Sequence, residues 1–120
     1  MLKENGIDAR CVRGSGNLKD ESGDILIHDV NGKWLMECKH WSQRTATPGE
    51  IRKAWIGICK QANKERCKPV LQLRINRKPN RYRVLLPSYG RLYEEPELWA
   101  EMSEKTFIML MKDELRWDDD

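Results

Sequence analysis

The stretch from residue 23 to residue 39 reads GDILIHDVNGKWLMECK, and it decides the fold. Two strand-like runs flank the dipeptide Asn31-Gly32. Because a type I′ turn needs positive φ at both of its central positions, Asn-Gly between two such runs is the strongest short signal for a β-hairpin. The sequence therefore predicts a hairpin with strands over residues 24–30 and 33–39.

The register of this hairpin brings ionisable groups onto one face. A two-residue loop at Asn31-Gly32 pairs Val30 with Lys33, which in turn places Asp24 opposite Lys39. Cross-strand partners share a face of the sheet, and so do residues two apart along a strand. One face is thus expected to carry Asp24, Leu26, Glu37 and Lys39. The other face is expected to be core, with Ile25, Ile27, Trp34, Met36 and Cys38.

The sequence around the hairpin predicts a mixed α/β arrangement. Thr47-Pro48-Gly49-Glu50 is a capping box with proline at the first helical position. From Ile51 onward, apolar residues recur with helical spacing, which predicts an amphipathic helix running to about Arg66. Further strands are expected over residues 9–13, 69–75 and 81–86, and a short helix over 97–104. Residues 107–111 form an apolar run too short to assign.

Length and composition limit the class of protein. A chain of 120 residues favours one domain, which we place at residues 1–113, followed by an acidic tail at residues 114–120. No run approaches the roughly 18 apolar residues of a membrane span, and no signal peptide follows Met1, so a cytoplasmic protein is expected. The four cysteines form no CxxC pair, and we expect free, mostly buried thiols rather than a zinc site or a disulfide framework.

The charge of the chain is unevenly distributed. Residues 39–83 carry 13 Lys and Arg against two acids, whereas the remaining residues carry 9 Lys and Arg against 17 acids. A basic centre between acidic ends favours a surface that faces a polyanion. A solvated surface whose charges happen to cluster is the alternative.

The shared face of the hairpin offers a possible metal site. Mg²⁺ takes oxygen ligands and often only one or two protein carboxylates, so Asp24 and Glu37 could hold it. Lys39 could then position an attacking water or stabilise charge on a phosphate. A purely structural salt bridge between Asp24 and Lys39 is the alternative, worth a few tenths of a kcal/mol on an exposed surface.

These residues also carry a family resemblance. Gly23-Asp24, followed thirteen residues later by Glu37-Cys38-Lys39, resembles the motif of the PD-(D/E)xK nuclease superfamily, with glycine in place of its proline. Together with RGSG at 13–16, Gln61-Ala62 and KPVL at 68–71, it resembles the archaeal and phage-type Holliday junction resolvases over roughly residues 2–86. The resemblance implies a restriction-endonuclease-like α/β fold, a central mixed β-sheet flanked by α-helices.

The resemblance assigns roles residue by residue. Asp24 and Glu37, with the backbone carbonyl of Cys38, would bind Mg²⁺, for which Mn²⁺ may substitute. Lys39 would be the catalytic lysine, and Ser15 would lie beside the site. DNA contacts are expected from the resemblance or from the basic surface, with plain surface roles as the alternative, at Arg13, Lys53, Lys60, Gln61, Arg77 and Lys78. The family also has an N-terminal helical glutamate whose position would fall before Met1; either the chain is shortened, or Glu4, Asp20 or Glu21 replaces it.

The resemblance implies a Mg²⁺-dependent endonuclease that resolves four-way (Holliday) junctions by phosphodiester hydrolysis. Branched double-stranded DNA would be the substrate, and a homodimer is expected because two strands must be cut at related positions. Such resolvases occur in phage as well as cellular genomes. The alternatives are a restriction- or repair-type endonuclease on the same fold, a non-catalytic DNA-binding module, and a protein-interaction domain.

Overall fold

A computed structural model describes residues 3–11, 23–29, 32–85 and 98–112. The acidic tail expected at residues 114–120 lies outside these ranges. A short 3-10 helix, η1 (Lys3–Asn5), ends at Gly6, whose φ of 76° suits a residue without a Cβ. It leads into β1 (Asp8–Cys11), the first strand of the sheet.

Six strands form one sheet, in the spatial order β1-β2-β3-β4-β5-β6. The remaining strands are β2 (Gly23–Asp29), β3 (Gly32–Trp41), β4 (Lys68–Ile75), β5 (Arg81–Leu85) and β6 (Trp99–Ser103). Only β3 and β4 run parallel, and α1 (Pro48–Lys64) connects them, as a parallel connection requires. The predicted α/β class, with a central mixed sheet flanked by helices, is confirmed.

The hairpin of β2 and β3 forms as predicted, but its register differs by two residues. Asp29 pairs with Gly32, so the connection consists of residues 30 and 31, and Asp24 lies opposite Glu37 rather than Lys39. A shift of two residues leaves every side chain on the same face of the sheet, so the apolar pattern cannot distinguish the two registers. The observed pairing therefore keeps the predicted assignment of residues to the two faces, and the two carboxylate-bearing residues become direct neighbours.

The helix α1 begins where the capping pattern predicted. The Thr47 side chain accepts a hydrogen bond from the backbone N–H of Glu50 at 3.2 Å, and Pro48 is the first helical residue. At the other end, the N–H of Cys67 donates to the Ala62 carbonyl at 2.8 Å, with Arg66 at a φ of 59°. This is a Schellman-type ending, which returns the chain to the sheet as β4.

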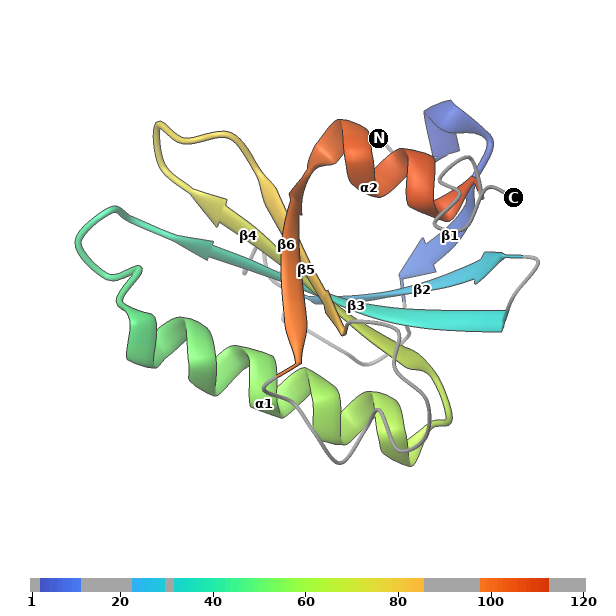
Figure 1. Ribbon diagram of the computed structural model, residues 1–120, viewed down its shortest axis with the longest axis horizontal. Coiled ribbons are helices and arrows are strands. Elements are labelled where there is room, and N and C mark those ends of the chain that lie inside the picture. The colour runs from blue at the N-terminus through green and yellow to red at the C-terminus, as the bar shows by residue number, and fades with distance from the viewer. Residues whose placement is uncertain (1–2, 12–22, 30–31, 86–97, 113–120) are drawn as a thin grey trace.

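The two helices cover opposite faces of the sheet (Figure 1). On the α1 face, Leu35, Leu71 and Leu73 pack against Trp55 and Ile58 of the helix. On the other face, α2 (Glu104–Met111) buries Phe107 and Met111 among the side chains of the sheet. That second core includes the predicted core residues Ile27, Met36 and Cys38 as buried members, with Ile25 and Trp34 packed at its edge.

The α2 face contains a buried polar network. Gln72 Nε2 donates to the hydroxyl of Tyr82 at 2.9 Å, and that hydroxyl donates to Glu104 Oε1 at 3.0 Å. The Tyr82 ring stacks on Phe107, with centroids 4.4 Å apart. Burial raises the pKa of the Tyr82 hydroxyl well above its usual value. The network satisfies its polar atoms within the core, as a structural role requires.

The prediction of a helix over residues 97–104 is wrong. Residues 99–103 form β6, which pairs with β5, and the helix starts only at Glu104, with Ser103 as its N-cap. The Ser103 hydroxyl accepts from the N–H of Thr106 at 3.2 Å. Trp99, which lies within the range predicted as a helix, is a strand residue that is 36% exposed. Pairing with β5 overrides the local helix propensity of this segment.

Candidate active site

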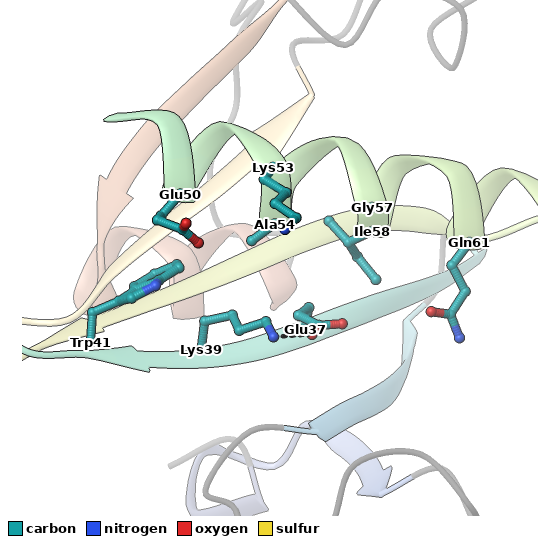
Figure 2. Close-up of a pocket in the computed structure, with 9 residues that line it drawn as sticks. All are labelled: Glu37, Lys39, Trp41, Glu50, Lys53, Ala54, Gly57, Ile58 and Gln61. Atoms are coloured by element: carbon teal, nitrogen blue, oxygen red, sulfur yellow. Dashed lines mark ion pairs between the residues drawn. The ribbon is translucent and has the colours of Figure 1, made fainter. Parts of the chain in front are cut away.

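A groove of about 380 Å³ lies between α1 and β3, on the face where the sequence placed its ionisable residues (Figure 2). From β3, Glu37, Lys39 and Trp41 line one wall, because residues two apart along a strand share a face. From α1, successive turns of the helix line the other wall through Glu50, Lys53, Ala54, Gly57, Ile58 and Gln61. The strand and the helix thus bring residues far apart in sequence to one cavity.

The centre of the groove is an acid–base pair on β3. Lys39 Nζ lies 3.5 Å from Glu37 Oε1, and both side chains are partly exposed, at 38% and 21%. On the neighbouring strand, Asp24 is the backbone partner of Glu37. Directly opposed residues hold their Cβ atoms about 5 Å apart and on the same face. Lys39 therefore has an ion-pair partner on its own strand, and the alternative of a structural salt bridge between Asp24 and Lys39 stays a prediction.

The predicted DNA-contacting residues fall into two groups. Lys53 and Gln61 line the groove itself, and Lys60 lies exposed on α1 without lining it. Arg77 and Lys78 lie exposed on the turn between β4 and β5. That turn is attached to the Trp41 end of the groove, since the N–H of Asn76 donates to the Trp41 carbonyl at 3.0 Å.

Two predicted site residues are outside the described part of the chain. Arg13 and Ser15 lie within residues 12–22, as do Asp20 and Glu21, two of the candidates for the missing family glutamate. Their roles stay predictions.

The donor set suits a hard cation. Asp24, Glu37 and the Cys38 carbonyl supply oxygen atoms, the ligands that Mg²⁺ and Mn²⁺ take. Cys38 directs its side chain into the core on the opposite face of the sheet, so only its backbone is left to serve the groove. Among the side chains described, no three of His, Cys, Asp and Glu converge as a metal cluster. Mg²⁺ often takes only one or two protein carboxylates and fills its other positions with water or substrate.

A second acid–base cluster lies on the same face, at the β5–β6 end of the sheet. Arg83 Nε donates to Glu101 Oε2 at 2.9 Å, and Arg81 Nε donates to Glu101 Oε1 at 3.2 Å. The Arg83 guanidinium lies 3.6 Å from the centroid of a Trp99 ring and 5.9 Å from one of Trp55. Arg83 is 7% exposed, so its guanidinium is closed to solvent and serves packing.

The cysteines behave as the sequence predicted where they are described. Cys38, Cys59 and Cys67 are free and buried. Burial raises the pKa of the Cys59 thiol to about 12, and burial also raises the pKa of Cys67. Neither is a nucleophile at neutral pH, since the thiolate is the reactive form. No helix among the described residues is long and apolar enough to cross a membrane.

Sequence reasoning missed part of the groove. Trp41 is not among the residues predicted for the site, although its spacing of four from Glu37 places it on the same face. Glu50 is predicted only as part of the helix cap, and Gly57 is not among the predicted site residues. Their helical spacing with Lys53 and Gln61 is the signal that could have grouped them, but the sequence alone does not say which face of the helix meets which strand.

Comparisons with known proteins give a weak structural similarity. No protein-family model matches the chain, and no curated protein matches it. Among solved structures, the chain is similar to Archaeoglobus fulgidus Hjc, a Holliday junction resolvase from an archaeal hyperthermophile, at 16% sequence identity. The similarity covers 88% of this chain and 82% of that one, with a TM-score of 0.38. This score is too low to assign a family or an activity, so the functional argument depends on the groove.

Proposed function

We propose that this protein is a metal-dependent DNA endonuclease of the PD-(D/E)xK type that resolves four-way junctions. One observation carries the proposal: Asp24 lies opposite Glu37 in the β2–β3 ladder, and Lys39 follows two residues later in the same groove. This is the order and spacing of the superfamily motif, on adjacent strands that place its residues together.

Each motif residue has a chemical role in this proposal. Asp24, Glu37 and the Cys38 carbonyl hold Mg²⁺, with Mn²⁺ as a substitute. When bound, the ion neutralises charge on the scissile phosphate and makes a coordinated water more acidic. Lys39 donates hydrogen bonds from its ammonium group, orienting the attacking water and stabilising negative charge on the phosphate. The groove supports this role because Lys39 reaches Glu37 while it remains 38% exposed.

The basic residues around the groove supply the contacts to DNA. Lys53 and Gln61 line it, and Arg77 and Lys78 lie on the turn attached to its Trp41 end. Contacts of this kind bind the phosphate backbone and do not distinguish the bases, so we expect recognition of branch shape rather than sequence. The protein acts as a homodimer in this proposal, since a junction needs two symmetric cuts.

The test uses the purified 120-residue chain with a labelled four-way junction and a matched linear duplex, each with Mg²⁺ or with EDTA. Glu37→Gln removes the charge that faces Asp24 while it keeps the shape of the side chain. Glu65→Gln makes the same change at the exposed C-terminal end of α1, at a residue that does not line the groove. We expect symmetric, Mg²⁺-dependent nicks with the wild type and with Glu65→Gln, and none with Glu37→Gln.

Other outcomes separate the competing functions. Cleavage of the linear duplex with half-site sequence preference would indicate a restriction- or repair-type enzyme. Junction binding without cuts, unchanged in Glu37→Gln, would indicate a non-catalytic DNA-binding module in which Glu37 and Lys39 form only a structural pair. Absence of any DNA binding would overturn the proposal.

A further inference from the structure

Gly57 occupies the middle of α1, where a glycine is unfavourable. Apart from proline, glycine is the residue least suited to a helix interior, because it gives up the most backbone freedom. A Cβ placed at Gly57 would meet nothing within 4 Å. The packing of the protein therefore does not require the missing side chain, and its absence needs a reason outside the fold.

The position of Gly57 suggests that reason. Gly57 lines the groove across from Glu37 and Lys39, between Lys53 and Gln61 (Figure 2). It is exposed, so the helix backbone itself forms the surface of the groove at this point. Glycine is the residue used where a ligand must approach a backbone closely.

Three lysines and Gly57 share one face of α1, which continues from the groove along the helix. Lys53, Gly57, Lys60 and Lys64 are spaced by four, three and four residues, as residues on one helical face are. Lys53 and Lys60 are about 10 Å apart along the axis at 1.5 Å per residue. This distance corresponds to about three nucleotides of one DNA strand, at about 3.4 Å of duplex axis per nucleotide. Lys60 and Lys64 do not line the groove, so a ligand that contacts them and reaches Lys39 must be a polymer.

We propose that one strand of the DNA substrate leaves the groove along α1 and passes over Gly57, with its sugar-phosphate backbone packed against the backbone of the helix. The phosphates on either side contact Lys53 and Lys60. This inference depends on the proposed nuclease function, and it adds the path of the substrate. Gly57 is a positioning residue here, because its lack of a side chain leaves room for the strand.

The experiment compares two glycines of the same helix. Gly57→Ala and Gly57→Gln add side chains of increasing size where the strand passes. Gly49→Ala and Gly49→Gln add the same side chains at a residue of the first turn that does not itself line the groove, and a Cβ there also meets nothing within 4 Å. The measurements are thermal unfolding, binding of a labelled four-way junction in EDTA, and nicking of that junction with Mg²⁺.

We expect opposite effects on stability and binding at Gly57. Both substitutions should raise the melting temperature, by about 4 °C for alanine, because they favour the helix. Junction affinity and nicking should fall, by about threefold for alanine and at least tenfold for glutamine. The Gly49 variants should bind and cut as the wild type does.

Two outcomes would count against the inference, and they are distinguishable. If the wild type and all four variants bind and cut the junction equally, the strand does not pass over Gly57, and the nuclease proposal stands. If the wild type itself neither binds nor cuts DNA, the nuclease proposal fails and the inference fails with it.

Discussion

Two acid–base clusters share one row of the sheet, yet they differ in almost every physical respect. Glu37, Leu71, Arg83 and Glu101 are successive partners across β3, β4, β5 and β6. At one end, Glu37 pairs with Lys39 beside an open groove. At the other end, Glu101 binds two arginines, and tryptophan rings flank one of them.

The difference shows how the same residue types serve reactivity or stability. A carboxylate with two guanidinium partners has its hydrogen-bonding capacity filled and cannot readily exchange them for a ligand. Glu37 contacts the flexible ammonium group of Lys39 at 3.5 Å and lines an open groove, where a cation or a water can reach it. Leu71, fully buried, separates the two clusters. Substitutions in the open cluster, Glu37 and Lys39, should therefore change activity. Substitutions in the closed cluster, Arg81, Arg83 and Glu101, should change stability.

The largest expected effect is the loss of activity in Lys39→Met. Methionine keeps much of the side-chain length and removes the charge. Because the pair with Glu37 is partly exposed, the free energy of unfolding should change by less than about 0.5 kcal/mol. If Lys39 acts on the phosphate, junction nicking should fall at least about 100-fold, roughly 3 kcal/mol of transition-state stabilisation. Single-turnover nicking and denaturant unfolding measure the two quantities.

Lys53→Met is the matched control for Lys39→Met. It removes a second ammonium group from the same groove, but one that lies on α1 and outside the motif. We expect weaker junction binding with a nearly normal rate at saturating protein. Equal loss of the saturating rate in both variants would mean that the groove acts through its total positive charge rather than through Lys39.

The next largest effect is expected in the closed cluster, from Glu101→Gln. This change leaves the Arg83 guanidinium, 7% exposed, without its counter-charge. Removing one partner of a fully buried pair costs about 3–5 kcal/mol. Because Glu101 is 20% exposed and the contact between Arg83 and Trp99 remains, we expect about 2 kcal/mol and a fall in melting temperature of roughly 8 °C. Nicking per folded molecule should not change.

Two results with Glu101→Gln would contradict the division of the sheet into one cluster that serves activity and one that serves stability. Unchanged stability would show that the guanidinium does not depend on its carboxylate. A loss of nicking in fully folded protein, checked by circular dichroism at the assay temperature, would show that the two clusters are coupled through the sheet.

The alkylation rate of Cys59, a buried thiol of α1, can test whether the closed cluster limits transient opening of the core. Its pKa of about 12 is raised by burial and lowered in part by the nearby charge of Arg83. At pH 8 only about one thiol in 10⁴ is then ionised, so labelling needs transient opening of the protein. We expect very slow alkylation of Cys59 in the wild type, and roughly tenfold faster alkylation in Glu101→Gln, measured by peptide mass spectrometry. Equal rates in the two proteins would mean that this cluster does not control opening around α1.

The hairpin shows what the sequence could and could not predict about the site. Alternation of apolar residues fixed which of Asp24, Glu37 and Lys39 share a face, because burial depends on parity. It did not fix the register, since moving the strands by two residues buries the same side chains. The pairing of Asp24 with Glu37 therefore depends on the turn, and the turn signal at Asn31-Gly32 led to the wrong partner.

The C-terminal region was mispredicted for a different reason. Residues 99–103 contain Ala100, Glu101 and Met102, which favour a helix locally. They form a strand because Glu101 pairs with Arg83 of β5, a partner eighteen residues away that no local pattern reveals. The same segment held a signal for the start of a helix, namely Ser103 three residues before Thr106, which now cap α2.

The smallest expected effect separates the two arginines of the closed cluster. Arg81 contacts Glu101 at 3.2 Å, but its side chain is 53% exposed, whereas that of Arg83 is 9% exposed. An exposed ion pair is worth about 0–1 kcal/mol and is screened by salt. Arg81→Gln should therefore lower the melting temperature by only about 2 °C in low salt, and the difference should vanish in about 1 M KCl, where the screening length is about 3 Å. A large loss that persists in high salt would mean that Arg81, too, belongs to the buried part of the cluster, and that closure of this site depends on both guanidinium groups.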